Sequence, residues 1–411
     1  MRLLRRRVRD LDVAALRSRS SREGWLVETP EVLRAGLGPA LAEIPLPEGL
    51  EGPSNVRELL DAFELVGDEG PSGSGVTAYA SLPFERGEPA TLSVPRFQFT
   101  RTRDGSCWLT GPEGDDSWNE LLAEASAPLQ EPLFPRTLAY RPTADEYAHT
   151  VARAVELLRH KELDKVVLAR AVSGTVPEMI DPAALAERLR RREPLCTIYS
   201  LPVSGGRRFV GASPELLVRR DGVEVTCHPL AGTIALPANV AADDYQTWLL
   251  GSAKNLHEHA VMVDDVVQLL TRYFEDIEAD ATPSIVALRS VAHLGTWVRA
   301  RARDEAPDAL SVLALLHPTA AVGGIPRRAA HDLIIQLEEH PRGHYAGPLG
   351  WMDARGDGEW WVGIRGVLVE GDSFEAWAGA GIVSESDPTA EREETRDKLA
   401  SVLSALLAER V

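Results

Sequence analysis

The sequence predicts a protein of the α+β class, and two observations support this prediction. Segments with strand-like patterns follow one another in runs, separated by tight turns such as the Asp-Gly pairs at residues 221–222 and 357–358. Helical patterns lie between these runs and do not follow every strand. Regular alternation of strands and helices would indicate a doubly wound parallel sheet, so the observed order favours antiparallel sheets with separate helices.

Composition narrows the possible functions. The 411 residues can bury a large core, as one big domain or two, and a content of 44% hydrophobic and 26% charged residues is typical of a soluble globular protein. The formal net charge of −18 argues against nucleic acid or an anionic membrane as the main partner. An anionic substrate would therefore need a local positive site or a bridging cation.

Three further features concern location. The first ten residues are basic, but no apolar segment follows them, so they do not form a secretory signal. No apolar run is long enough to span a membrane. The three cysteines, Cys107, Cys196 and Cys227, lie far apart in the sequence. They are expected to be reduced thiols, which favours a cytoplasmic protein.

The N-terminal part, residues 1–140, has short and weak patterns. Its many Gly and Pro residues suggest loops on an antiparallel scaffold. Helical patterns occur at residues 8–19 and 56–64, and strand patterns at residues 76–82, 96–102 and 107–110. A proline-rich stretch at residues 131–142 leads into the main part of the chain, residues 141–411.

Clearer signals follow in the main part. Thr143 is a helix cap with acidic residues behind it, and Asp387-Pro388 opens the last helix with a cap and a proline at the first helical position. The expected helices cover residues 143–160, 242–251, 253–274, 309–316, 326–339 and 389–410. The expected strands cover residues 163–176, 198–203, 207–211, 215–220, 222–227, 346–353, 359–370 and 373–382.

The last helix carries charged residues close to a glycine-rich strand end. Glu391, Glu394 and Lys398 stand at positions i, i+3 and i+7 and therefore share one helix face. Carboxylates in a first helical turn can simply interact with the helix dipole. The glycine-rich residues 378–381 and the lysine one turn later favour a second interpretation, a floor for a small anion and a metal ion.

Lys165 and Glu215 form a candidate acid–base pair. Lys165 begins an apolar strand, where a lysine is usually a surface residue but can also be a buried base with a lowered pKa. Glu215 follows a small-residue turn, where a glutamate is more often a solvated residue. If both side chains meet in one site, the lysine can act as the base and the glutamate as the acid.

Glu258 continues the buried stripe of a predicted helix. A carboxylate in that position is costly unless it is paired or binds a metal ion. Its neighbours His257 and His259 lack the spacing of a zinc site. With Glu391 and Glu394 the ligand set would consist of oxygen atoms alone, which suits Mg²⁺ better than zinc.

Further candidates have weaker signals. Arg365 lies in an apolar strand, either as a sheet-edge residue or as a bidentate contact to a carboxylate. The loops at residues 229–233 and 317–324 consist mainly of small residues, which let a ligand approach the backbone closely. His293 alone is more typical of a hydrogen-bonded core residue than of a catalytic one.

Seven sequence blocks occur together in this chain, in a characteristic order and spacing. They are KVVLAR (165–170), GASPE (211–215), PLAGT (229–233), SAK (252–254), EH (258–259), HPT (317–319) and the stretch from AGAGI to ET (378–395). Through these blocks the chain resembles the chorismate-utilising enzymes from Thr143 to the C-terminus. That family includes isochorismate, salicylate, anthranilate and aminodeoxychorismate synthases.

A few positions separate the members of this family. Ala231 stands where aminodeoxychorismate synthases have an attacking lysine, and Lys165 stands where anthranilate synthases typically have glutamine. Both positions favour water as the nucleophile. Salicylate synthases share the lysine but usually have threonine at the position of Ala321. The loop is more similar to that of isochorismate synthases, although Ala320 replaces a proline and Asn255 replaces an acidic residue of the family pattern.

The resemblance implies an isomerase reaction, the Mg²⁺-dependent conversion of chorismate to isochorismate. Lys165 would be the base for water at C2, and Glu215 the acid for the leaving C4 hydroxyl. Glu258 and Glu394 would hold Mg²⁺, with Glu391 bound directly or through water. The residues that the resemblance places around the substrate are Gly232, Thr233, His293, Ala321, Tyr345, Arg365, Gly379 and Lys398.

The resemblance also implies two large packed antiparallel sheets with helices outside, the N-terminal part completing the same fold. We expect no obligatory glutaminase subunit and a monomer or weak homodimer. The product could enter siderophore, menaquinone or other metabolism. The alternatives are a salicylate synthase, which also eliminates pyruvate, an anthranilate or aminodeoxychorismate synthase large subunit, and a non-catalytic chorismate-binding protein.

Overall fold

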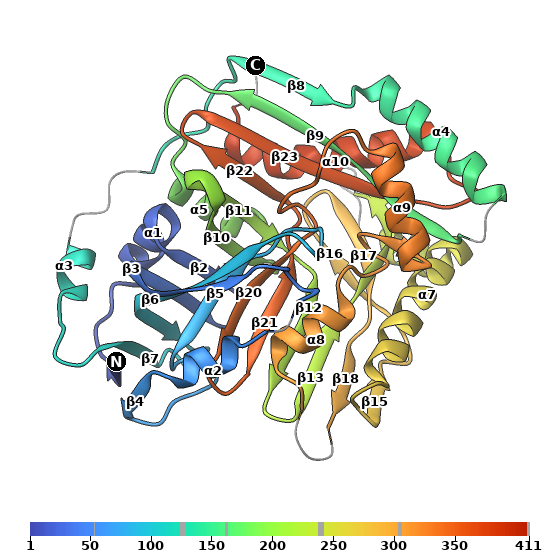
Figure 1. Cartoon of the computed structure of the whole chain (residues 1–411). Helices are drawn as coiled ribbons and strands as arrows, with labels where there is room; N and C mark the ends of the chain where they lie inside the picture. Colours follow the sequence, from blue (N-terminus) through green and yellow to red (C-terminus); the bar gives the residue numbers. More distant parts are fainter. Residues whose placement is uncertain (53, 124–128, 161–162, 237–241, 303–305, 409–411) are drawn as a thin grey trace.

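The computed structural model describes residues 1–52, 54–123, 129–160, 163–236, 242–302 and 306–408. Within these ranges the strands form one continuous hydrogen-bonded sheet of 20 strands and a separate sheet of three, with helices on the outside (Figure 1). In the described chain, paired strands are antiparallel except β1 (Arg2–Val8) and β4 (Glu64–Gly67), which are parallel. The α+β class predicted from the sequence is confirmed.

The large sheet has two halves, joined where β5 meets β6 at the register pair Tyr79 and Ser93. The two sheets expected from the sequence are therefore connected by hydrogen bonds. The first half contains, in order of pairing, β15 (Asp276–Ala279), β18 (Val298–Arg301), β13 (Glu224–His228), β12 (Leu216–Asp221), β21 (Gly358–Val362), β20 (Pro348–Asp353) and β5 (Thr77–Ser81).

The second half begins at β6 and is longer. Its main series is β6 (Ala90–Arg101), β3 (Leu33–Leu46), β2 (Trp25–Glu28), β10 (Thr197–Val203), β11 (Arg207–Ser213), β22 (Gly366–Glu370), β23 (Ser373–Ile382) and β9 (Lys165–Thr175). β8 (Thr137–Arg141) and β19 (Gly324–Ile325) pair with β9, and β7 (Cys107–Pro112) joins β6 to β1. N-terminal strands thus pair with strands from the main part of the chain.

Large aromatic side chains pack between the two halves. Trp25 and Tyr199 come from the second half, and Tyr79, Trp351 and Trp361 come from the first. All five are less than a tenth exposed. Burial of such side chains removes a large apolar area from water, so this layer stabilises the contact between the halves.

Helices surround the sheet. α10 (Pro388–Leu406) packs on β23 and on α4 (Ala144–His160), while α5 (Pro182–Arg192) lies between α1 (Val13–Glu23) and β11. α8 (Ala309–Leu316) packs on β12, and α9 (Arg327–Leu337) on β9. Asp387 caps α10 as predicted, because its carboxylate accepts a hydrogen bond from Ala390 N at 2.8 Å.

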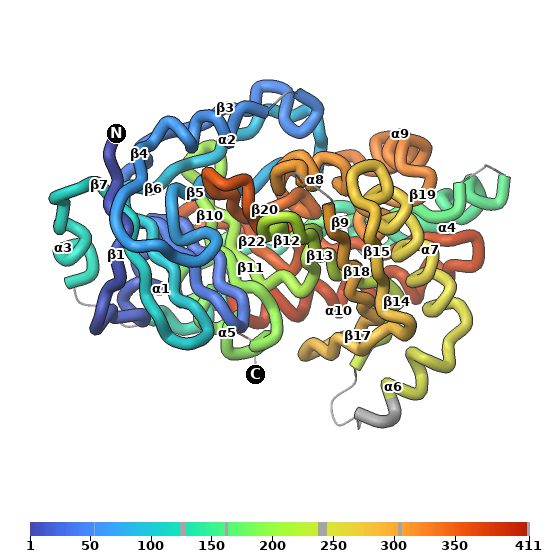
Figure 2. The backbone as a smooth tube through the Cα atoms, turned by 90° about the horizontal axis from the view of Figure 1, so that it is seen from below, coloured from blue at the N-terminus to red at the C-terminus, as the bar shows by residue number. Residues whose placement is uncertain are grey.

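The three-stranded sheet lies beside α7 (Ala253–Leu270). It consists of β14 (Leu230–Ala235), β17 (Val291–Gly295) and β16 (Ser284–Ala287), and α6 (Ala242–Gly251) packs nearby. The shorter helices α2 (Val56–Asp61) and α3 (Trp118–Ala123) belong to the N-terminal part. Figure 2 shows β1, β3 and α1 at one end of the molecule and α7, β15 and β18 at the other.

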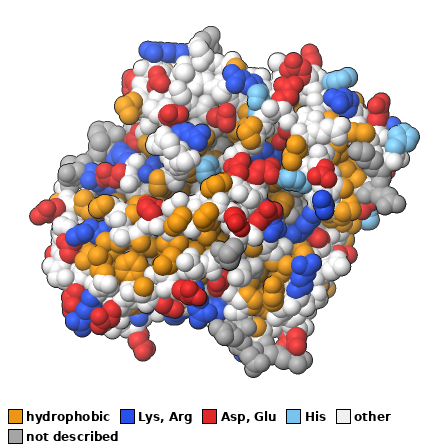
Figure 3. Space-filling model, in the orientation of Figure 1, with side chains coloured by type: hydrophobic (Ala, Val, Ile, Leu, Met, Phe, Trp, Pro, Cys, Tyr) orange, Lys and Arg blue, Asp and Glu red, His pale blue; other side chains and the backbone are white. Residues whose placement is uncertain are grey.

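The surface is of mixed charge. Acidic and basic side chains are interspersed on the face shown in Figure 3. No helix in the described ranges is long and apolar enough to cross a membrane. Cys107, Cys196 and Cys227 are all free thiols, and the last two are buried.

Several sequence predictions in the N-terminal part were wrong. The helix expected at residues 8–19 begins only at Val13, after the cap Asp12, and β1 precedes it. β2 and the long β3 were not predicted, because Gly36, Gly38 and two prolines interrupt the alternation of β3. A β-bulge near these residues lets the strand continue despite the interruption.

Two predictions near the C-terminus also need correction. The strand expected at residues 359–370 is two strands, β21 and β22, because the chain turns between them and Arg365 has a φ of 53°. A Cβ at Gly363 would lie 2.8 Å from the Gly347 carbonyl oxygen, so this turn requires a glycine. The last helix ends at Leu406, and its predicted end at Arg410 lies outside the described residues.

Candidate active site

A pocket of about 720 Å³, counting its open mouth, lies between β9, β23, β14, α7 and α10. All predicted site residues except Glu391 line it. Some of them belong to the sequence blocks described above, whereas His293, Tyr345 and Arg365 come from other parts of the chain that the fold brings to the same pocket. The walls also include Val167, Ile364 and Trp377, which were not among the predicted site residues.

Lys165 and Glu258 form a buried ion pair in this pocket. Lys165 begins β9 and is 7% exposed, and its Nζ atom lies 2.7 Å from Glu258 Oε1. Burial would raise the pKa of Glu258, but the Lys165 ammonium outweighs it and keeps that pKa below its ordinary value. The interpretation of Lys165 as a surface residue is therefore wrong. Gly381 leaves room for the pair, since a Cβ there would lie 2.7 Å from Lys165 Cε.

Glu215 lies on the turn between β11 and β12 and is only 4% exposed. Its Oε1 atom has no hydrogen-bond partner. Burial raises the pKa of Glu215 to about 8, although the nearby Lys165 charge opposes this shift. The carboxyl is therefore mainly protonated at neutral pH and has a proton to donate.

His293, Thr233 and Arg365 form a hydrogen-bonded series in the pocket. His293 Nδ1 lies 3.0 Å from Thr233 Oγ1, and Arg365 Nη2 lies 3.3 Å from His293 Nε2. A guanidinium can only donate, so Nε2 accepts and the ring proton resides on Nδ1. Burial, together with the Arg365 charge, lowers the pKa of His293 well below its ordinary value. His293 is therefore neutral, and it orients the arginine.

Lys398 and Tyr345 form another part of the wall. Lys398 Nζ donates to Gly379 O at 2.9 Å and to Glu394 Oε1 at 2.6 Å. The Tyr345 ring stacks on Trp377 with centroids 5.9 Å apart, and burial raises the pKa of Tyr345 to about 12. Tyr345 is thus a neutral hydroxyl donor at the edge of the pocket.

Trp377 could have been found from the strand pattern. Residues 377, 379 and 381 alternate along β23, so their side chains point to one face. Since the sequence predicts that the glycines on this face form the floor of a ligand site, the tryptophan two positions earlier should border the same ligand. Its Nε1 atom donates to Glu375 Oε1 at 2.7 Å, which orients the ring.

The three predicted metal ligands lie in one region but differ in surroundings. Glu258 and Glu394 line the pocket, each paired with a lysine. Glu391 is buried behind it and accepts a hydrogen bond from Ser386 Oγ at 2.7 Å. Among the described residues, no three His, Cys, Asp or Glu side chains gather closely enough to hold a metal ion.

The electrostatics of Glu391 nevertheless fit a cation site. Burial raises its pKa to about 7, and the charge of Glu394 contributes to the increase. A nearby divalent cation would relieve the repulsion between these carboxylates, and an all-oxygen set is what Mg²⁺ prefers. The donor types thus suit Mg²⁺.

The pocket has a positive charge balance on a strongly acidic protein. Lys165, Arg365 and Lys398 face Glu258 and Glu394, while Glu215 is mainly neutral. Such a site attracts an anion of small size, and a cation bound to the carboxylates would add to this attraction. The arrangement can therefore bind a carboxylate substrate and move protons on it.

The family of chorismate binding enzymes matches residues 83–407 of this chain. The chain belongs to the chorismate binding enzymes. The match begins before Thr143, so the family likeness includes β6 and β7 as well as the region where the sequence blocks occur.

Three proteins similar to this chorismate binding enzyme have names that describe an isochorismate synthase. A Mycobacterium tuberculosis protein provisionally named isochorismate synthase MenF is 38% identical over 346 residues, which are 82% of this chain and 87% of the relative. The vibriobactin-specific isochorismate synthase of Vibrio cholerae is 38% identical over 64% of this chain and 67% of the relative. MenF of Escherichia coli, a menaquinone-specific isochorismate synthase, superposes with a TM-score of 0.83 at 25% identity, covering 99% of this chain and 94% of MenF.

Proposed function

We propose that this chorismate binding enzyme is an isochorismate synthase, an isomerase that converts chorismate to isochorismate. The observation that carries the proposal is a protonated carboxyl, Glu215, and an amine, Lys165, in the wall of one pocket. The relatives named as isochorismate synthases support the same reaction.

The reaction moves a hydroxyl group between two ring carbons. Water adds at C2 and gives a proton to the Lys165 amine, which can act as the base only after the ammonium of the ion pair with Glu258 has lost its own proton. The C4 hydroxyl leaves as water after Glu215 donates a proton to it, and the ring double bonds shift. One water molecule enters and one leaves, so the product is an isomer of the substrate.

The remaining pocket residues would hold the two carboxylates of the substrate. Arg365 offers a planar donor fork that His293 orients. Tyr345 offers a neutral hydroxyl, while Gly232 and Gly379 leave space for the ligand to approach the backbone. Lys398 contributes positive charge close to Glu394.

We infer that Mg²⁺ is the cofactor, held by Glu258 and Glu394 with Glu391 bound directly or through water. When bound, the ion supplies positive charge for a substrate carboxylate. Glu391 can take this role because its Oε1 atom has few polar contacts: Ser386 Oγ lies 2.7 Å away and Lys254 Nζ 4.0 Å away. Asn255 contributes no charge where the family pattern has an acid.

Two positions support water as the nucleophile, and a third separates this chain from the salicylate synthases. Lys165 and Ala231 replace the residues typical of the ammonia- and lysine-dependent relatives, and both line the pocket. Ala321 also lines it, at the position where salicylate synthases usually have threonine. We also propose that the enzyme is cytoplasmic, that it needs no glutaminase subunit and binds neither a membrane nor nucleic acid, and that it is a monomer or weak homodimer. Siderophore and menaquinone relatives leave both pathways open.

Product identification tests the proposal. Purified protein is incubated with chorismate and MgCl₂, with and without EDTA, and the products are separated and identified. We expect isochorismate without pyruvate, and no turnover after chelation. Salicylate with pyruvate would contradict the proposal in favour of a salicylate synthase, and an aminated product with ammonium would favour an amide-transfer subunit. Chorismate binding without any product would indicate a non-catalytic protein.

A further inference from the structure

The strand that carries Lys165 has an interruption along one edge. On one side β9 pairs with β23 from Val166 to Thr175. On the other side it pairs with β19 at Lys165 and Val166, and with β8 from Ala171 onwards. Between these two pairings, in the described chain, no strand covers residues 167–170. The interruption lies at the pocket, because Val167 is part of its wall.

Two charged side chains take the place of the absent strand. Arg342 Nη2 donates to Val167 O at 2.7 Å, and Ala169 N donates to Glu338 Oε1 at 2.8 Å. Arg342 and Glu338 also bind each other, with Nε 2.8 Å from Oε2. Buried backbone groups are costly when unpaired, so this pair supplies the partners that a neighbouring strand would have given.

The same guanidinium reaches a second wall of the pocket. Arg342 Nη1 donates to Val322 O at 2.7 Å, and Val322 follows Ala321 in the loop of residues 317–323. Both loop residues line the pocket. Arg342 is 4% exposed and lies over the Phe84 ring, with its Cζ atom 4.5 Å from the ring centre. One side chain therefore joins the strand of Lys165 to the loop of Ala321.

We propose that Arg342, supported by Glu338, is a positioning residue of the enzyme: it fixes the strand of Lys165 relative to the loop of residues 317–323. The inference rests on the proposed function, because it concerns the position of Lys165 as the base beside the substrate ring. Only the planar fork of arginine can donate to two carbonyls and a carboxylate at once. A lysine has a single nitrogen and cannot span these three acceptors.

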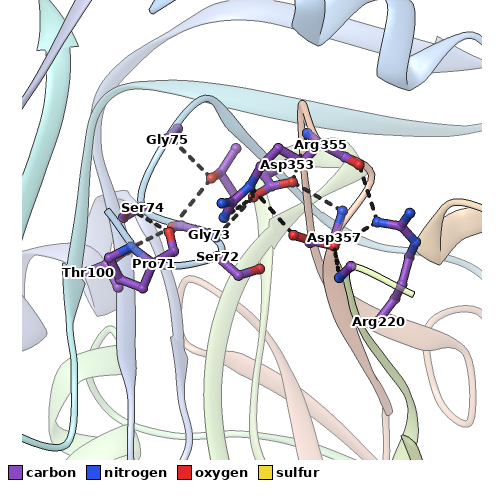
Figure 4. Close-up of polar contacts among 12 residues, drawn as sticks. Pro71, Ser72, Gly73, Ser74, Gly75, Thr100, Arg220, Asp353, Arg355 and Asp357 are labelled. Atoms are coloured by element: carbon purple, nitrogen blue, oxygen red, sulfur yellow. Dashed lines mark hydrogen bonds and ion pairs between the residues drawn. The ribbon is translucent and has the colours of Figure 1, made fainter. Parts of the chain in front are cut away.

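The chain offers a matched control in Arg220. This arginine is also buried, and its Nη1 atom donates to Asp357 Oδ1 at 2.6 Å and to Arg355 O at 3.2 Å. It lies in the polar network of Figure 4, away from the pocket residues. Arg220→Lys should thus disturb a comparable buried pair without moving the strand or the loop of the pocket.

The experiment compares Arg342→Lys, Glu338→Gln and Arg220→Lys with the wild-type enzyme. Displacement of a reacting group by a fraction of an ångström is expected to lower kcat of Arg342→Lys by about 10- to 100-fold. KM for chorismate should change by less than about 3-fold, because Arg365 and Lys398 remain in place. Glu338→Gln keeps an acceptor for Ala169 N and should show a smaller loss in the same direction. Arg220→Lys should lose thermal stability but keep kcat within about 2-fold of the wild type.

A second measurement does not depend on turnover. Amide hydrogen exchange should increase in residues 165–169 and 317–323 of Arg342→Lys but not of Arg220→Lys. Unchanged exchange there, or wild-type kcat in Arg342→Lys, would overturn the positioning role. An equal loss of kcat in Arg220→Lys would also overturn it. Wild-type protein that forms no isochorismate would instead contradict the proposed function, while the exchange result would still decide the inference.

Discussion

At the scale of single residues, burial determines which carboxyl groups of the pocket are charged. Glu215 and Glu258 both lie near Lys165, yet their pKa values shift in opposite directions. Glu258 accepts a hydrogen bond from the lysine, whereas Glu215 Oε1 has no partner to offset its burial. The same lysine can therefore leave one carboxyl protonated and keep the other ionised.

The protonated state of Glu215 predicts how kcat depends on pH. Because the acid must be protonated, kcat should fall as the pH rises through about 8, the raised pKa of Glu215. A pH–rate profile checks this, and a plateau continuing well above pH 8 would contradict the role.

Glu215→Gln serves as the matched variant. It should lower kcat by about 100- to 10,000-fold, because an amide cannot donate the proton. Its stability relative to the wild type should rise between about pH 4.5 and 8. In that range the folded wild type binds more protons at Glu215 than the unfolded chain does, so the wild type alone loses stability as the pH rises.

A second test ranks the predicted metal ligands Glu394 and Glu391 by their effect on Mg²⁺ affinity. Glu394→Gln removes a pocket-facing carboxylate and should raise the Mg²⁺ concentration for half-maximal activity by about 10- to 100-fold. Glu391→Gln should have a smaller effect if that residue acts through water, because it lies behind the pocket wall. Calorimetric titration with Mg²⁺ gives an independent readout. Equal metal affinity in all three proteins would exclude both residues as ligands.

At the scale of elements, the close approach of β23 to β9 makes a glycine necessary. Gly381→Ala would place a Cβ 2.7 Å from Lys165 Cε and 3.2 Å from Glu258 Oε1. We expect kcat to fall by about 10-fold or more while the melting temperature changes little, because the flexible lysine can move aside. Steady-state kinetics with thermal unfolding measures both effects.

Gly251→Ala provides the control for this variant. A Cβ at Gly251 meets nothing within 4 Å, so that change should leave kcat unaltered. If Gly381→Ala is as active as Gly251→Ala, the Lys165 position does not limit catalysis.

Much of the C-terminal part could be predicted from local signals. β23 has the predicted bounds, and α10 begins at Pro388 behind its cap, because proline and a capping Asp act within a few residues. The break between β21 and β22 could not be seen, since the turn packs Gly363 against the carbonyl of Gly347, which precedes β20. β2 and β3 were missed because glycines and prolines interrupt the alternation of β3 and because the pairing of β2 with β10 and of β3 with β6 is long-range.

Most residues of the candidate site could also be predicted, because short sequence motifs mark them. The family motifs were recognised in the sequence, and the fold places all predicted site residues except Glu391 in the pocket wall. Sequence alone could not decide between a surface and a buried Lys165, because burial depends on the surrounding elements. Arg342 was missed altogether, since its partners Val167 and Val322 are backbone groups that leave no mark on the sequence.

At the scale of the whole molecule, a polar network ties the N-terminal part to the main part (Figure 4). Asp353, at the end of β20, accepts hydrogen bonds from Gly73 N at 3.0 Å, Arg355 N at 2.9 Å and Asp357 N at 3.1 Å. Gly73 belongs to the N-terminal part, whereas the other two lie on the β20–β21 turn. The network therefore couples the folding of the two parts.

Removal of the carboxylate tests this coupling. Asp353→Ala leaves two buried N–H groups and one partly buried N–H group without their acceptor and should cost roughly 3 kcal/mol of unfolding free energy. Urea unfolding followed by fluorescence should show one transition at a lower midpoint. The exposed Asp372→Ala is the control and should change stability by less than about 0.5 kcal/mol. Loss of stability in both variants alike would contradict the role of the network.

The pairing of β9 with β23 has a consequence for synthesis of the protein. Val166 pairs with Ile382, so the strand bearing the base acquires its neighbour only when the last part of the chain is made. Glu394 and Lys398 follow later still. A nascent chain on the ribosome therefore carries Lys165 in an incomplete sheet for most of its synthesis, with an edge open to wrong partners. The enzyme can therefore become active only after the last part of the chain has been translated. Chains truncated before β23 should be inactive and prone to aggregate.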